Sequence, residues 1–162
     1  MRKAATSLSL VLAVLLGSGV AEETAETELP RETVRLIAYA SEEKSQAKHG
    51  ARNAIGGPLR ADPEYTSAAA DWSIFPVGME FRIVGKPTVY VIDDYGSGLI
   101  GKRIIDIHVL TISEMRKVNR RNVEIEIVKP GSYERALAIL KRRLGNSHCK
   151  TMYDRIRKKL SR

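Results

Sequence analysis

The segment that is most informative about the fold reads Val91-Ile92-Asp93-Asp94-Tyr95-Gly96-Ser97-Gly98-Leu99-Ile100-Gly101-Lys102-Arg103-Ile104-Ile105-Asp106-Ile107. The β-branched and aromatic residues 88–92 predict one strand, and residues 102–109 predict the next. The Asp- and Gly-rich stretch 93–98 between them predicts a loop. Asp106 therefore lies inside an apolar strand, where a charged side chain needs an explanation.

Two interpretations of Asp106 follow from this pattern. An ionised carboxylate in dry, apolar surroundings costs several kcal/mol unless it is paired. Asp106 is then either paired or a carboxyl of raised pKa in a cleft, as a general acid requires. Alternatively, it lies with Ile104 and His108 on the solvated face of an edge strand. His108 shares that face and either supports Asp106 or completes a hydrogen-bond network.

Further short strands are predicted on both sides of this segment. Alternating or β-branched residues mark 33–40, 79–84 and 122–128, and turns follow at 76–78 and 85–87. Ser113 predicts the N-cap of a single short helix. Short strands separated by turns over about a hundred residues predict a mainly β domain, a small closed barrel, over residues 33–129.

The basic charge of the chain is concentrated at one end. Lys and Arg number 27 and Asp and Glu 19, a formal net charge of +8. Residues 130–162 contain 10 basic and 2 acidic residues, and their apolar positions follow helical spacing. We expect a C-terminal helical tail of two short basic helices. It either packs on the barrel or, through residues 131–162, binds an anionic envelope polymer or a membrane surface.

Residues 1–21 have the three parts of a cleavable signal peptide. Arg2 and Lys3 precede an apolar run at 8–16, and small residues lead up to Ala21. That run is short for the roughly 30 Å of membrane hydrocarbon, which argues against an uncleaved anchor. An acidic linker follows at 22–32. Export to the periplasm, cell envelope or extracellular space is therefore expected, and nucleic acid is not an expected partner.

The histidines and the single cysteine, Cys149, do not indicate a metal site. One cysteine excludes an intramolecular disulfide, and no group of residues has metal-ligand spacing. We expect neither a metal nor a cofactor.

Asp94-x-Gly96 followed by Gly101-x-x-Ile104-Ile105-Asp106 resembles the signature of the 3D domain, a family named for three aspartates. The resemblance covers about residues 33–128. It includes Ala38-Tyr39 in the opening strand, the segment 67–72 with Asp71, the turn at 75–83 and the closing helix and strand at 113–125. The turn departs from the family pattern, since Tyr95 and Ser97 stand where Thr and a second Gly are usual.

This resemblance implies a fold and a function. The fold is a six-stranded double-psi β-barrel, shared with MltA-type lytic transglycosylases and small exported cell-wall proteins. Asp106 aligns with the catalytic aspartate, and Asp94 and Asp71 align with the other two. The implied substrate is the glycan strand of peptidoglycan, cleaved between N-acetylmuramic acid (MurNAc) and N-acetylglucosamine (GlcNAc). Asp106 would protonate the glycosidic oxygen and then deprotonate the muramyl 6-hydroxyl.

Asp94 and five further residues complete the expected site. Asp94 would raise the pKa of Asp106 by charge repulsion or hold a water molecule. The expected substrate-binding residues are Asp71, Trp72, Tyr95, Gly96 and His108. Trp72 and Tyr95 either stack on sugar rings or pack in the barrel, and Asp71 alternatively binds loop amides. A non-catalytic peptidoglycan- or polysaccharide-binding module is the alternative function, because fold does not determine activity.

Overall fold

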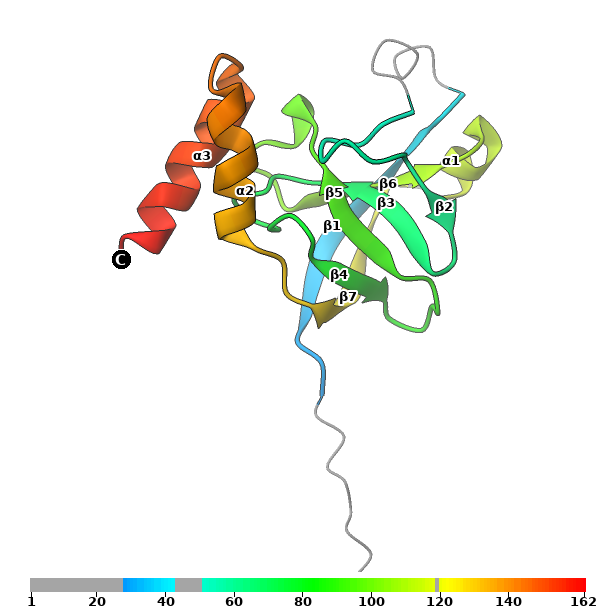
Figure 1. Ribbon diagram of the computed structural model, residues 1–162. Coiled ribbons are helices and arrows are strands. Elements are labelled where there is room, and N and C mark those ends of the chain that lie inside the picture. Colours follow the sequence, from blue (N-terminus) through cyan, green and yellow to red (C-terminus); the bar gives the residue numbers. More distant parts are fainter. Residues whose placement is uncertain (1–27, 43–50, 119) are drawn as a thin grey trace, which may run out of the picture.

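A computed structural model describes residues 28–42, 51–118 and 120–162 (Figure 1). The predicted signal peptide and the first part of the predicted linker lie outside the described residues. No helix in the described part of the chain is long and apolar enough to cross a membrane.

The fold is mainly β, as expected, and is built on one mixed sheet of seven strands (Figure 1). The strand order is β2-β3-β5-β4-β7-β1-β6, and β3 pairs in addition with β6. The pairs β1–β6 and β3–β5 are parallel, and the others are antiparallel. The strands are β1 (Arg31–Ala40), β2 (Ala61–Asp62), β3 (Tyr65–Ala69), β4 (Glu80–Ile83), β5 (Tyr90–Asp94), β6 (Ile104–Val109) and β7 (Arg121–Lys129).

Several predicted boundaries were wrong. The sheet has seven strands, and two of them, β2 and β3, were not among the strands predicted from the sequence pattern. β2 has two residues, too few to produce a period-2 pattern. β1 begins at Arg31, inside the predicted linker, where Arg31 pairs with Glu126 on β7 at 2.6 Å. Helix α1 (Ile112–Val118) is capped by Thr111, not Ser113. The Thr111 hydroxyl accepts from the Glu114 amide, and the Glu114 carboxylate accepts from the Thr111 amide.

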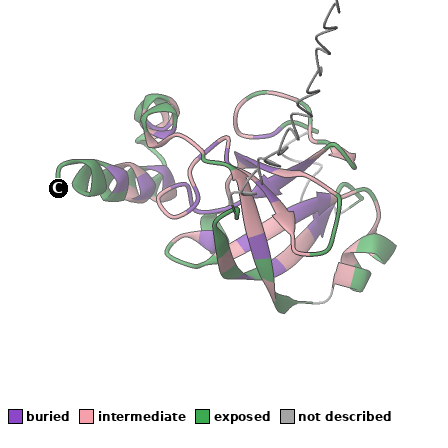
Figure 2. Cartoon of the chain, turned by 90° about the horizontal axis from the view of Figure 1, so that it is seen from below, coloured by how far each residue is buried: buried purple, intermediate pink, exposed green. Residues whose placement is uncertain are grey.

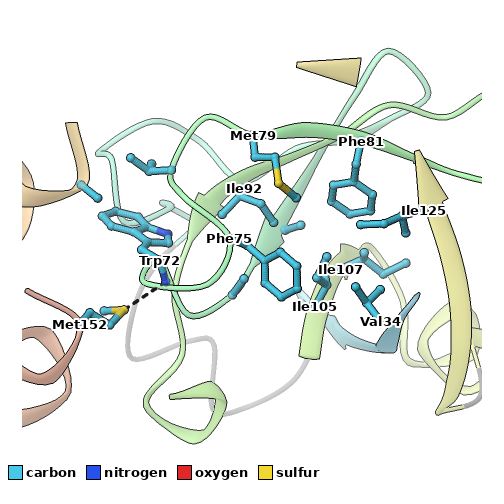
Figure 3. Close-up of a cluster of buried hydrophobic side chains, with 14 of the residues drawn as sticks. Val34, Trp72, Phe75, Met79, Phe81, Ile92, Ile105, Ile107, Ile125 and Met152 are labelled. Carbon is cyan, nitrogen blue, oxygen red and sulfur yellow. Dashed lines mark hydrogen bonds between the residues drawn. The ribbon is translucent and has the colours of Figure 1, made fainter. Parts of the chain in front are cut away.

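The strand β6 has two different faces. Ile105 and Ile107 are buried in the main core, together with Phe75, Phe81 and Ile92 (Figure 3). Successive side chains of a strand point to opposite faces, so Asp106 lies on the other face. β6 pairs with β1 on one side and β3 on the other, so the prediction of a solvated edge strand was wrong.

A second, smaller apolar cluster lies apart from the main core. Its buried members are Tyr39, Ala69 and Leu99, and Ile37, Leu59 and Ile104 pack against it. Ile104 is on the same face of β6 as Asp106. The carboxylate of Asp106 is therefore on a face with limited apolar cover, next to Ala69 and Ile37, its register partners on β3 and β1.

Residues 130–162 form two helices that belong to the main core. α2 (Tyr133–Leu140), a single 3-10 turn at Lys141–Arg143 (η3) and α3 (Ser147–Leu160) pack together beside the sheet (Figure 1). The buried residues of these helices join the sheet residues in one cluster, which Figure 2 shows continuing from the strands into the helices. They are Ala136, Leu140, Cys149, Met152 and Ile156. The Trp72 amide donates to the Met152 sulfur at 3.3 Å (Figure 3). The interpretation of a packed helical pair is confirmed.

Because α2 contributes to the main core, shortening Leu140 is expected to destabilise the whole domain. Leu140→Ala should lower the free energy of unfolding by about 2–5 kcal/mol, measured by urea denaturation. Leu144→Ala is the matched control, because Leu144 is 38% exposed whereas Leu140 is fully buried. It should change stability by less than about 0.5 kcal/mol. Equal effects of the two variants would contradict the integration of this helix into the core.

Candidate functional site

The two predicted catalytic aspartates lie on either side of one small residue. Ala69 on β3 pairs with Asp94 on β5 and with Asp106 on β6. Directly paired residues on neighbouring strands are about 5 Å apart and project to the same face. Ala69 between them is itself buried, packed with Tyr39 and Leu99. Both aspartates are half-buried, and the strand register brings the predicted pair together.

A β-bulge at Asp93 creates this arrangement. Ala68 pairs with Ile92 and Ala69 with Asp94, so Asp93 is the extra residue on β5. The bulge keeps Ile92 in the main core and still places Asp94 beside Ala69 on the other face. Bulges of this kind often redirect side chains next to functional sites. The prediction that β5 ends at residue 92 was therefore wrong, and Asp93 is not a turn residue.

Asp93 is fully buried and bound by three donors. Its Oδ2 accepts hydrogen bonds from the Asn53 amide at 2.8 Å, the Ser67 hydroxyl at 2.8 Å and the Tyr65 hydroxyl at 3.1 Å. Burial raises the pKa of the Asp93 carboxyl, and these hydrogen bonds oppose that rise. Asn53, Ser67 and Tyr65 were not among the predicted residues, and only the paired aspartates in the sequence hint at such a network.

Asp94 holds the loop before β2 against the end of β5. Its Oδ1 accepts from the Ala54 amide at 3.1 Å and from the Tyr95 amide at 2.9 Å. The side-chain amide of Asn53, the residue before Ala54, donates to the Asp93 carboxyl. Two successive loop residues are thus bound to two successive aspartates. This fixes both the loop and the orientation of the Asp94 carboxyl.

Tyr39 lies at the site but was not among the predicted site residues. Its side chain is 7% exposed, and its hydroxyl has no hydrogen-bond partner among the described residues. The pKa of Tyr39 is raised, first by burial and then by the charges of Asp94, Asp93 and Asp106. Tyr39 therefore remains protonated close to all three carboxyl groups. The resemblance of Ala38-Tyr39 to the opening strand was the only sequence signal for it.

His108 completes a hydrogen-bond network, one of its two predicted roles. The imidazole is 2% exposed, and its Nδ1 lies 3.0 Å from the Arg60 carbonyl oxygen. That oxygen can only accept, so the proton is on Nδ1, and Nε2 accepts from the Ser41 hydroxyl at 2.7 Å. The ring also packs on Tyr39, with centroids 5.2 Å apart. His108 therefore supports the site through packing and hydrogen bonds, and it is too buried to contact a substrate.

Asp71 has a structural role, so its predicted part in substrate binding was wrong. The carboxylate is fully buried. Oδ1 accepts from the amide and hydroxyl of Ser73, and Oδ2 accepts from the Gly101 amide at 2.6 Å and from Arg155 at 3.2 Å. Gly101 has a φ of +78°, a conformation that favours glycine. Asp71 thus ties two turns next to the sheet to helix α3, as the alternative interpretation of bound loop amides predicted.

The two aromatic residues proposed to stack on sugars pack against other parts of the protein: Trp72 is buried and Tyr95 is half-buried. Trp72 is fully buried, and its indole N–H donates to the Asp94 carbonyl oxygen at 2.8 Å. The Tyr95 ring meets Trp72 edge-on, with centroids 5.0 Å apart. Its hydroxyl accepts from Arg143 at 3.1 Å and from the Cys149 thiol at 3.3 Å. Tyr95 therefore joins the end of β5 to the C-terminal helices.

Gly96 allows a close approach of the chain. A Cβ at this position would meet the side chain of Leu99 at 3.3 Å, so glycine lets Leu99 fold back into the small cluster. Gly96 thus has a packing role, and its contact with a substrate stays a prediction.

Two further observations complete the description of the site. Among the described residues, no group of three or more His, Cys, Asp or Glu side chains could hold a metal ion. No model of a known protein family matches the sequence. No curated protein matches it significantly either.

The buried carboxyl of Asp93 should make stability depend on pH. Its pKa is higher in the folded protein than in the unfolded chain, so the folded protein binds more protons between the two values. This contribution is fully present below the unfolded value and is lost as pH rises through the folded one. We expect the unfolding free energy of wild type, relative to Asp93→Asn, to fall from acid to neutral pH. Denaturant titrations at several pH values measure this difference, and a constant difference would contradict the raised pKa.

Two tyrosines near the aspartates should differ in their contribution to stability. Tyr65→Phe removes a donor to the buried Asp93 carboxyl and should cost about 1–3 kcal/mol. Tyr39→Phe removes a hydroxyl without a partner among the described residues, so stability should change by less than about 0.5 kcal/mol. Urea denaturation of both variants tests the contrast. A larger loss for Tyr39→Phe would show that its hydroxyl is already bound.

Proposed function

We propose that this protein acts on the glycan strands of peptidoglycan and cleaves the MurNAc–GlcNAc bond as a lytic transglycosylase does. The observation that carries the proposal is the placement of Asp94 and Asp106 across Ala69, on the face of the sheet away from the main core. The proposed place of action is the periplasm, cell envelope or extracellular space, reached through the predicted signal peptide.

The strand pairings support a proposal about the fold as well. The strands β3, β5, β4, β7, β1 and β6 each pair with two others in this series, and β6 pairs back to β3. Such a closed series is expected of a barrel, with β2 added outside it. We propose that it is the double-psi β-barrel of the 3D-domain family, whose signature the sequence resembles at Asp94 and Asp106.

The proposed reaction needs one carboxyl group that first gives and then accepts a proton. Asp106, protonated, donates to the glycosidic oxygen as the bond to the muramyl anomeric carbon breaks. The muramyl 6-hydroxyl oxygen then bonds to that carbon, and its proton returns to the Asp106 carboxylate. The products are a free GlcNAc 4-hydroxyl and a 1,6-anhydromuramyl end, and no water is consumed.

The neighbours of Asp106 suit this chemistry. Asp94 is oriented by two backbone amides, so its charge is held in place during the reaction. Tyr39, kept neutral by burial and by the nearby carboxylates, packs beneath the site and adds no further negative charge to it. Preorganised groups of this kind stabilise developing charge more effectively than mobile ones.

One observation favours the alternative of a non-catalytic glycan-binding module. Of the three signature aspartates, Asp71 is fully buried and engaged with four donors. Only Asp94 and Asp106 are therefore available to a glycan. A binding module would use them to accept hydrogen bonds from sugar hydroxyls.

The decisive experiment is the analysis of products from purified peptidoglycan sacculi by mass spectrometry. We expect wild-type protein to release 1,6-anhydromuropeptides and Asp106→Asn to release none, because the substitution removes the proton donor. Asp154→Asn is the control. Asp154 is exposed on α3 and forms its ion pair with Lys150 of the same helix. The control should keep wild-type activity, and circular dichroism should show that both variants are folded.

The other outcomes separate the candidate functions. Reducing muramyl ends in place of anhydro ends would identify a hydrolase. Binding of wild-type protein to sacculi without any products would establish the binding module. Undiminished release by Asp106→Asn would exclude Asp106 as the acid.

A further inference from the structure

A groove between the loop before β2 and the C-terminal helices has no role in the function proposed so far. Its volume is about 340 Å³. The loop contributes Ala54 and Ile55, α2 contributes Ala138 and Ile139, and the following turn contributes Arg142 and Arg143. Four of the six lining residues are apolar, and the two charged ones follow the end of α2.

One wall of the groove is fixed directly to the candidate site. The Ala54 amide N–H donates to Asp94 at 3.1 Å, and the Ala54 carbonyl oxygen accepts from Arg143 at 2.8 Å. A single residue therefore touches Asp94 on one side and borders the groove on the other.

The positive charge in the groove is not neutralised by the protein. Arg143 donates to the Tyr95 hydroxyl and to the Ala54 carbonyl oxygen, both uncharged groups. Arg142 is exposed. None of the ion pairs among the described residues includes either arginine. Arg143 is thus held in place by two hydrogen bonds. Arg142 forms no ion pair with a carboxylate of the described residues.

Arginine donors beside small apolar side chains suit a carboxylate carried on a short apolar stem. A guanidinium binds a carboxylate through paired hydrogen bonds, and the alanine and isoleucine side chains offer contacts for methyl groups. In peptidoglycan, MurNAc carries such a group, a lactyl ether extended by alanine and then by an acidic residue. Neutral GlcNAc carries none.

We propose that this groove binds the start of the peptide stem on MurNAc, with the carboxylate of the stem on Arg142. The identity of the ligand rests on the proposed peptidoglycan substrate. The groove would then set the register of the glycan, because the substituted sugar is placed on the α2 side of Asp94. Strands that carry stems would be preferred over stripped strands.

Binding of two matched ligands tests the proposal. The full chain is titrated with N-acetylmuramyl-L-alanyl-D-glutamine, whose one free carboxylate is the α-carboxylate that an intact stem leaves free, and with its neutral methyl ester. Calorimetry or NMR measures the binding. We expect wild type to bind the acid about two- to fivefold more tightly than the ester, the range of an accessible arginine–carboxylate contact. Arg142→Gln should lose this preference. Lys141→Gln removes an adjacent exposed charge that does not line the groove and should keep it.

Each contrary result overturns the proposal. Equal affinity of wild type for acid and ester, or no binding of the acid, would show that the groove does not recognise the carboxylate. An equal loss in Lys141→Gln and Arg142→Gln would show attraction by general positive charge. These ligands contain no MurNAc–GlcNAc bond, so the result does not depend on cleavage. An Arg142-dependent preference without products from sacculi would leave the groove established and the transglycosylase activity refuted.

Discussion

The burial of the Asp93 carboxyl at the bulge in β5 is the interaction on which the site depends. A carboxyl group removed from water needs hydrogen-bond donors, and here three side chains from the loop and from β3 bind its Oδ2. The bulge changes the alternation of β5, so that Ile92 fills the core while Asp94 faces Ala69. The same network fixes Asn53 and, through the next residue, the Asp94 side chain.

A second buried carboxylate connects the C-terminal helices to this arrangement. Asp71 binds the turn at Gly101 and also Arg155 of α3, while Trp72 contacts Met152. Helices that carry most of the net positive charge of the chain are therefore part of the core rather than an appendage. Their apolar faces are buried in the core, and their Lys and Arg side chains remain at the surface.

The sequence anticipated that Asp94 and Asp106 lie together, because their positions depend on strand register. Asp94 and Asp106 follow a motif within a short stretch of chain, and local pairing through Ala69 brings them together. The prediction failed for Asp71, Trp72 and Tyr95, because each is covered or bound by a partner more than twenty residues away. Exposure of a polar or aromatic side chain is a property of the assembled structure, and no local pattern encodes it.

The sequence by itself determined the mainly β character, most of the strands, the short helix and the two amphipathic basic helices. These follow from the spacing of apolar residues, which acts over a few neighbours at a time. Only the tertiary structure decided that Asp93 continues a strand, that Tyr39 lies among three carboxyl groups and that the C-terminal helices complete the core. The physical reason is that burial and hydrogen bonding are shared between distant segments. A carboxylate is stable in a strand only when the loop that supplies its donors has folded over it.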